Sequence, residues 1–434
     1  MKAANVILRA AIALVPLALV PAMAWAQDQA PAPAPAASDQ PAAPANWWDT
    51  VTYTGHIEGG ITGNPQDPKD GINFGQLSND KASTPLLNQF TFIVQRPFDP
   101  KADYDTSFKF QPLIGSDARY SHSVGLLGDA AHNSNIQYDI LEAWVSEHTP
   151  WLGEGGTDIK FGKYVTPIGT EVVDATGNFF YTHSYEYNFG VPISHFGGLA
   201  VTHVIPELDV YYGADSGENT TPWDDNNNSG GLLGGFGFNL MDGNLTILAL
   251  THAGPDTPNN NHSWRYENDI LFTYKASDTW TLGGEANWIY DDTGFNGSGA
   301  SAFGYAQYAA YTINDWLSAG ARAEVYRDNQ GFFVGQFGNN SDFMTAQEGN
   351  ATTSAATRFP GRETYGEFTL GLNIKPPIPD EYAAFNGIVF RPEVRYDTVF
   401  SPGKPFIGQT QPTVTGTSDH QFLISADVIV PFSL

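Results

Sequence analysis

The amino-acid sequence predicts an all-β protein, a transmembrane antiparallel up-and-down β-barrel of about 16 strands. Three observations predict it. Short segments of alternating apolar and polar residues repeat from residue 49 to the C-terminus. Their connections alternate between short turns and long acidic loops, as the two sides of an outer-membrane barrel require. The region after the leader has no apolar run of about 18 residues, so a transmembrane helix is not expected.

The residues before the barrel are expected to direct export. Residues 1–26 are typical of a signal peptide, with a basic start, a short apolar stretch and the cleavage site Ala24-Trp25-Ala26. Residues 27–48 are rich in proline and alanine and predict an extended periplasmic linker. The barrel is predicted over residues 49–434.

The strands are predicted where period-2 alternation is clearest, and their even number is typical of bacterial single-chain barrels. One segment changes phase near Ile140-Leu141, which indicates either a β-bulge or a misplaced boundary. The predicted strands cover residues 50–60, 86–98, 103–114, 136–147, 158–165, 196–204, 207–213, 231–240, 244–253, 264–275, 279–290, 301–313, 316–327, 363–374, 387–397 and 421–432.

Short and long connections alternate along the whole predicted barrel. With the N-terminus in the periplasm, every short turn lies there and every long loop lies outside the cell, which predicts a location in the bacterial outer membrane. The short connections are residues 99–101, 148–157, 205–206, 241–243, 276–278, 314–315 and 375–386, and the long ones include 61–85, 115–135, 166–195, 328–362 and 398–420.

Several strands separate an apolar face from a charged face. In residues 387–397, one face carries Phe390 and Val394, and the other carries Arg391 and Arg395. An arginine directed at the middle of a bilayer costs about 2–4 kcal/mol, so the charged faces are expected to line water. The last strand has apolar residues on one face up to Phe432 and resembles the C-terminal signal that outer-membrane proteins present to the barrel-assembly machinery, although Phe432 is not the final residue.

Composition excludes several classes of function. Cysteine is absent, which removes disulfides and thiolate chemistry, and the net charge of −27 argues against a nucleic-acid partner. No G-x-S-x-G or H-E-x-x-H motif occurs, and the histidines show no metal-binding spacing on a helix. We therefore expect no enzyme, no cofactor and no metal site. The acidic run 224–228 has oxygen ligands for calcium but lacks EF-hand spacing, and a solvated loop is the favoured interpretation.

One segment carries motifs specific enough to suggest a family. Its motif elements are Gly162-Lys163-Tyr164, Thr166-Pro167, Gly169, Glu171, Asn178, Ser184-Tyr185, Pro192 and His195-x-Gly197. With these elements the chain resembles the OmpL-like family of β-barrel porins, over most of the chain after the leader in general form but only over residues 162–198 in detail. The resemblance implies a pore in the outer membrane but no particular solute, because substrates in that family are mostly unassigned.

The long connection 166–195 differs from the others because it is aromatic and acidic. We expect it to fold into the barrel and narrow the pore, with acidic loop residues facing basic wall residues across a transverse field. In the alternative interpretation the arginines pair with wall acids such as Glu324, Glu367 and Glu393 and only stiffen the wall. The candidate constriction residues are Glu171, Asp174 and Glu186 on the loop and Lys109, Arg265, Arg322, Arg391 and Arg395 on the wall.

The predicted function is a passive diffusion channel for small hydrophilic solutes, with a mild cation preference that follows from the acidic excess. Outer-membrane lipid and lipopolysaccharide are the expected surroundings, and a homotrimer is expected only by analogy with porins of this size. Two alternatives remain open. One is a structural or adhesion barrel that binds a partner through exposed loop residues such as Trp223 or Phe332-Phe333. The other is an outer-membrane lipid hydrolase with catalytic residues drawn from separate strands.

Overall fold

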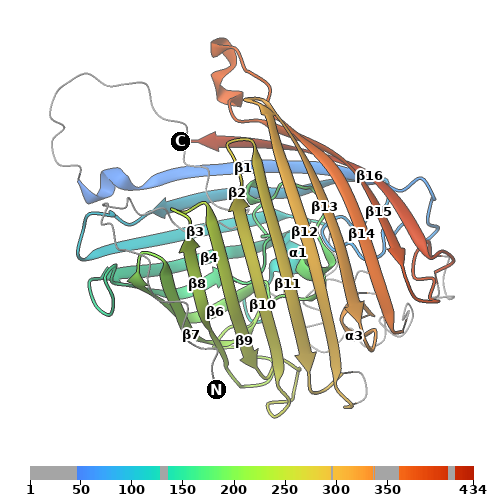
Figure 1. Ribbon diagram of the computed structural model, residues 1–434, viewed down its shortest axis with the longest axis horizontal. Coiled ribbons are helices and arrows are strands. Elements are labelled where there is room, and N and C mark those ends of the chain that lie inside the picture. Colours follow the sequence, from blue (N-terminus) through green and yellow to red (C-terminus); the bar gives the residue numbers. More distant parts are fainter. Residues whose placement is uncertain (1–45, 128–134, 295–296, 336, 338–360, 409–415) are drawn as a thin grey trace, which may run out of the picture.

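The computed structural model describes residues 46–127, 135–294, 297–335, 337, 361–408 and 416–434. Over these residues sixteen antiparallel strands form one closed barrel, shown in Figure 1. Each strand pairs with its neighbours in the sequence, and β1 pairs with β16 to close the sheet. The predicted fold class is therefore confirmed. The predicted signal peptide and most of the linker lie outside the described residues.

Every predicted strand has a counterpart, and most ends differ by only a few residues. The largest difference is at β7, which continues to Glu218 instead of ending at Gly213. The strands are β1 (Thr52–Gly63), β2 (Pro85–Arg96), β3 (Asp105–Gly115), β4 (Gln137–Thr149), β5 (Thr157–Val165), β6 (Ser194–Ile205), β7 (Leu208–Glu218), β8 (Gly231–Leu240), β9 (Leu245–Gly254), β10 (Arg265–Lys275), β11 (Trp280–Asp291), β12 (Ala300–Asn314), β13 (Leu317–Asp328), β14 (Glu363–Ile374), β15 (Val389–Val399) and β16 (His420–Ser433).

The helices are short and belong to the connections. Among the described residues, none of them is long and apolar enough to cross a membrane. They are η1 (Trp47–Thr50), α1 (Ala118–Ser121), η3 (Ala175–Gly177), α2 (Tyr185–Phe189), α3 (Phe332–Gly335) and η4 (Asp380–Phe385).

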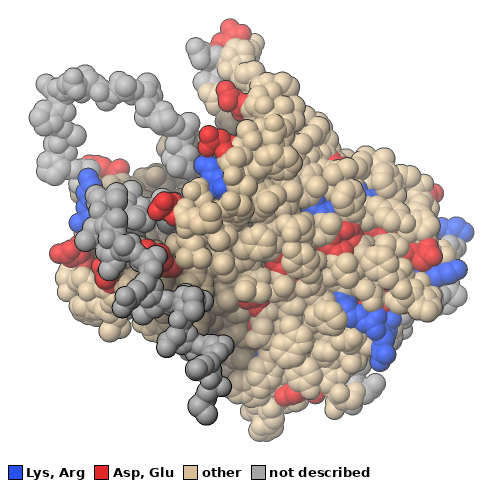
Figure 2. Space-filling model, viewed as in Figure 1, with Lys and Arg blue, Asp and Glu red and all other residues tan. Residues whose placement is uncertain are grey.

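The two faces of the wall differ as the alternation predicts. On β15, Arg391 and Arg395 are at most 3% exposed, whereas Val394 and Tyr396 are about two-fifths exposed. Uncharged residues form most of the outer wall that Figure 2 shows. The charged side chains therefore face the interior of the barrel, and the apolar ones face outward, where a bilayer would solvate them.

The phase change predicted near Ile140-Leu141 is a β-bulge. On β3, Gln111 lies opposite Glu142, and the next residue, Pro112, lies opposite Ile140, so that Leu141 has no partner in the ladder. The extra residue directs the Leu141 side chain inward, where it packs in a small apolar cluster and is 1% exposed.

The long connections pack together into an apolar core at one end of the barrel. This core corrects one expectation: Phe333 is buried in it and Phe332 packs against it, so the Phe332-Phe333 pair is not exposed. Trp223, in contrast, is 60% exposed. The core includes Phe74 and Leu77 from residues 64–84, Tyr120 of α1, Tyr185 and Phe189 of α2, Phe333 of α3 and Phe406 from residues 400–419.

Candidate pore constriction

The connection between β5 and β6, residues 166–193, lies inside the barrel against its inner wall. At its base, Thr166 N donates to Ile193 O at 3.0 Å, which joins its two ends. Beyond that base, Tyr185 and Glu186 on α2 have no solvent-exposed surface. The segment bonds to inward-facing side chains of β2, β11, β13 and β15. We call residues 166–193 the internal loop.

Wall glutamates bind the backbone amides of the internal loop. A buried carboxylate needs donors, and a loop has amides that no strand or helix pairs, so each group satisfies the other. Such charge-assisted hydrogen bonds are stronger than neutral ones. The bonds join Glu285 to Thr170 N (2.7 Å), Glu324 to Tyr185 N and Glu186 N (both 2.7 Å), and Glu393 to Tyr181 N (2.9 Å) and Thr182 N (3.1 Å).

Wall arginines bind the backbone carbonyls of the same loop. Each guanidinium also pairs with a wall carboxylate, which leaves its remaining donors directed at the loop. The loop is thus held through both its amides and its carbonyls. The arginine bonds join Arg322 to Thr182 O (2.8 Å), Arg391 to Ala175 O (3.0 Å) and Asn178 O (2.7 Å), and Arg395 to His183 O (2.6 Å).

The structure brings one predicted acid and one predicted base into direct contact. Glu171 Oε1 lies 2.5 Å from Arg322 Nη1. Arg322 also pairs with Glu367 at 3.1 Å, as the wall-stiffening interpretation expects. Arg322 therefore makes both the contact with a loop acid that a constriction requires and the contact with a wall acid that stiffening of the wall requires. Glu324 and Glu393 accept loop amides, a role that neither interpretation included.

The other predicted residues occupy different surroundings. Asp174 accepts from Gln111 at 2.8 Å and keeps a fifth of its side chain exposed. Lys109 pairs with Glu142 at 2.7 Å. Arg265 pairs with Glu218 and Asp291, and so does not meet the loop acids with which it was grouped.

Glu186 lies among carboxylates. Its pKa is raised well above the ordinary value by burial and then by the nearby carboxylates of Glu285 and Glu324. Burial and mutual repulsion therefore favour the protonated, uncharged form of Glu186 in this carboxyl cluster beside the loop helix α2.

Wall glycines make room for the internal loop. Their positions on the interior face of the predicted strands indicate this role, which the sequence-based expectations did not include. A Cβ added at Gly320 would lie 2.3 Å from the Phe179 ring, and one added at Gly304 would lie 2.7 Å from Glu186. Both glycines alternate in phase with the buried charged or aromatic residues of their strands. Glycine on the interior face of a strand indicates close approach by another segment.

We expect acid to weaken the attachment of the internal loop through Glu171. Burial opposes ionisation of this carboxyl, but Arg322 and His183 outweigh it and lower the pKa from 4.5 to about 2. A depressed pKa contributes stability above the unfolded value, which is lost as pH falls from 4.5 towards 2. The thermal unfolding midpoint of the wild type should therefore fall more steeply between pH 4.5 and 2 than that of the Glu171→Gln variant. Parallel curves for the two proteins would contradict this assignment.

Comparison with known proteins supports the architecture. The family model described as "Putative beta-barrel porin-2, OmpL-like" matches residues 50–432. No curated protein matches the chain.

Three solved structures share the fold, at identities that bear on the fold alone. The outer membrane channel DcaP of Acinetobacter baumannii is 10% identical, with a TM-score of 0.51, and the match covers 88% of this chain and 97% of that one. An anion-selective porin from Comamonas acidovorans is 10% identical, with a TM-score of 0.52 and coverage of 88% and 99%. OmpT of Vibrio cholerae, in trimer form, is 11% identical, with a TM-score of 0.52 and coverage of 88% and 99%.

The family match spans nearly all of the described barrel, and the solved structures of similar fold include outer-membrane channels and porins. The closed antiparallel sheet, with apolar side chains outside and charged ones inside, is the architecture that such proteins need in a bilayer. The chain belongs to the OmpL-like family of β-barrel porins and is a barrel of the bacterial outer membrane.

Proposed function

We propose that this protein is a passive diffusion channel for small hydrophilic solutes whose lumen is narrowed by the internal loop. The observation that carries the proposal is the double attachment of the loop, through amides to wall glutamates and through carbonyls to wall arginines. A segment fixed in this way occupies a constant part of the cross-section. It would filter solutes by size, while the partly exposed side chains of Asp174 and Lys109 act on their charge.

A mild cation preference forms part of the proposal. The chain has a net charge of −27, which favours cations over anions near its surface. The Comamonas neighbour is described as anion-selective, so the shared fold does not determine the sign of the preference. Reversal potentials in a salt gradient test this part, and a clear anion preference would contradict it.

Replacement of the loop tests the narrowing. Residues 168–191 can be exchanged for a short Gly-Ser turn, because the Thr166–Ile193 bond already closes the base. We expect planar-bilayer recordings to show a higher single-channel conductance and a weaker ion preference. As a control, shortening the connection 375–388 at the other end of the barrel should change neither quantity. Unchanged conductance in the loop-replaced barrel would refute the narrowing.

Liposome swelling separates a channel from a closed scaffold. Vesicles that contain the protein should swell in small sugars, whereas an adhesion barrel that uses Trp223 would leave them impermeable.

A homotrimer is proposed as the assembly, since one structural neighbour is described in trimer form. The mass of the detergent-extracted complex measures it directly.

A further inference from the structure

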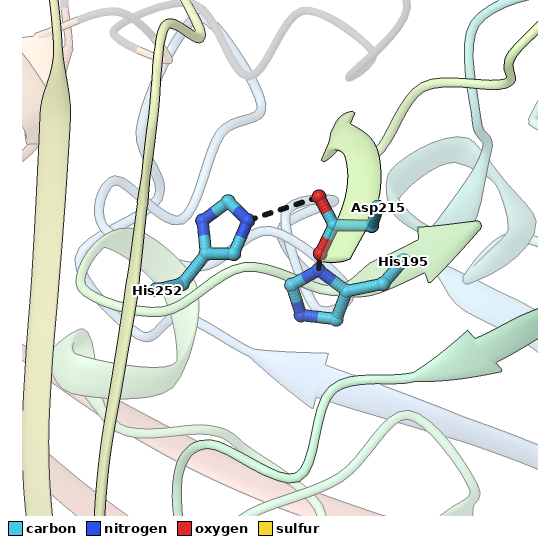
Figure 3. Close-up of side chains that lie close together, drawn as sticks. All are labelled: His195, Asp215 and His252. Carbon is cyan, nitrogen blue, oxygen red and sulfur yellow. Dashed lines mark hydrogen bonds and ion pairs between the residues drawn. The ribbon is translucent and has the colours of Figure 1, made fainter. Parts of the chain in front are cut away.

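Three residues far apart in the sequence meet inside the barrel wall next to the base of the internal loop. They are His195 at the start of β6, Asp215 on β7 and His252 near the end of β9. Figure 3 shows the Asp215 carboxylate between the two imidazoles, with one oxygen directed at each ring. Asp215 Oδ2 lies 3.0 Å from His195 Nδ1, and Asp215 Oδ1 lies 3.2 Å from His252 Nε2. The candidate ligand atoms all lie within 4.8 Å of one another.

Polar atoms of this cluster lack hydrogen-bond partners although they are fully buried. The side chains of all three residues have no exposed surface. His195 Nδ1 and Asp215 Oδ2 are close, yet neither has a hydrogen-bond partner among the described residues. A buried polar atom without a partner costs free energy, unless a bound ion satisfies it.

The outer nitrogens of the two imidazoles have a hydroxyl and a carboxylate as neighbours, a hydrogen bond for His195 and a longer contact for His252. His195 Nε2 lies 3.0 Å from Thr166 Oγ1, and His252 Nδ1 lies 3.7 Å from Glu267 Oε2. Without a metal, His252 Nε2 hydrogen-bonds to Asp215 Oδ1, whereas His195 Nδ1 and Asp215 Oδ2 stay 3.0 Å apart with no hydrogen bond. A bound cation would satisfy this unpaired nitrogen and oxygen and would replace the proton on His252 Nε2. Metal-bound histidines commonly donate their other N–H to a carboxylate or similar acceptor, as this arrangement allows.

The backbone is shaped around the cluster. Gly231 pairs with Asp215 across β7 and β8, and a Cβ at Gly231 would lie 2.3 Å from His252 Nε2. The pairing of β6 with β7 shifts register between His195 and Gly197, which marks a β-bulge beside the cluster. Bulges of this kind redirect side chains and recur next to functional sites.

We propose that His195, Asp215 and His252 bind a divalent transition metal, with Zn²⁺ as the best match, and that the ion fastens the base of the internal loop to the wall. Two imidazoles and one carboxylate are a ligand set that suits zinc, whereas calcium and magnesium prefer oxygen alone. Tetrahedral zinc with bonds of about 2.0–2.2 Å separates its ligand atoms by about 3.3–3.6 Å. The two histidine–aspartate spacings of 3.0 and 3.2 Å are slightly shorter, and all the candidate ligand atoms lie within 4.8 Å, so small side-chain shifts would admit the ion. The contact from His195 to Thr166 links the ion to the loop.

The first test is metal binding by full-length protein purified without a histidine tag. After chelation and dialysis against Zn²⁺, elemental analysis should find about one tightly bound ion per chain. Co²⁺ in place of zinc should give the visible absorption bands of a tetrahedral nitrogen and oxygen site. His195→Gln, His252→Gln and Asp215→Asn should each remove the ion and the bands. Absence of bound metal in the folded wild type, or equal binding by the folded variants, would overturn the proposal.

A matched control lies on the same strand. His203 sits between Asp158 and Asp209, with each ring nitrogen already facing a carboxylate, and a quarter of its side chain is exposed. His203→Gln should therefore retain the ion. If the site variants fail to fold, the wild type alone still decides: Zn²⁺ but not Mg²⁺ should slow amide exchange at Thr166 and Ser194. Equal exchange with and without zinc would refute the fastening role, whatever the channel's conductance proves to be.

Discussion

Replacement of Arg322 by methionine is expected to release the middle of the internal loop from the wall, at a local cost of about 3–5 kcal/mol. The guanidinium is completely buried and contacts Glu171 at 2.5 Å, Glu367 at 3.1 Å and the Thr182 carbonyl at 2.8 Å. Methionine fills comparable space but removes the closest cation of two buried carboxylates, leaving Glu171 with His183 at 3.3 Å and Glu367 with Arg395 at 3.8 Å. Breaking a buried ion pair from one side costs more than the pair contributes, because the remaining charge is unsolvated.

Hydrogen exchange measures this release directly. Because 1.4 kcal/mol corresponds to a factor of ten, exchange at the loop amides should accelerate about a hundredfold to a few thousandfold. Strand amides distant from β13 should keep their rates. Unchanged exchange over residues 166–193 would show that Arg322 does not hold the loop.

Two further variants distinguish loss of the loop's attachment to the wall from general destabilisation of the barrel. Arg265→Met also removes an arginine that pairs with two carboxylates, Glu218 and Asp291, and has only 12% of its side chain exposed. It lies away from the loop acids, so loop exchange should stay slow. Combining Arg322→Met with Glu171→Gln and Glu367→Gln removes the stranded charges and should restore much of the protection.

The fold was predictable because the geometry of a membrane barrel imposes regular patterns on the sequence. Successive side chains of a strand alternate between the lipid and the lumen, and the alternation of short and long connections gives the number of strands. The phase change at Ile140-Leu141 marked a real bulge. The exception at β7 has a physical reason: Asp215, Ser216 and Glu218 are polar on both faces where the strand leaves the apolar zone, so alternation fades although the ladder continues.

The site was predictable only as a segment. The aromatic and acidic composition singled out the loop, but its contacts depend on side chains far away in the sequence, such as Arg322 for Glu171. Charge patterns pair acids with bases, so Glu324 and Glu393 were considered only as partners for arginine. Their actual partners are backbone amides, which every residue except proline carries and no composition reveals. The His195, Asp215 and His252 cluster was missed because its members lie on three strands and have no local spacing.

Substitution of Gly320 by valine is expected to push the internal loop off the wall and into the lumen, at a cost of about 1–3 kcal/mol. A Cβ at this position already lies 2.3 Å from the Phe179 ring, so the ring must move. The Gly320 backbone is ordinary strand and accepts a β-branched residue, so the barrel itself should persist. Because the displaced ring moves into the lumen, single-channel conductance should fall.

The contrast between two backgrounds makes this result specific. Gly198→Val on the outer face of β6 controls for adding a β-branched residue to a strand, since a Cβ there has its nearest neighbour at 3.8 Å, and it should leave conductance unchanged. In the barrel whose residues 168–191 are replaced, Phe179 is gone, and Gly320→Val should have no effect either. This non-additivity is the signature of two elements in contact. An equal fall in conductance with and without the loop would instead place the effect in the wall, and the loop would then not set the width of the pore.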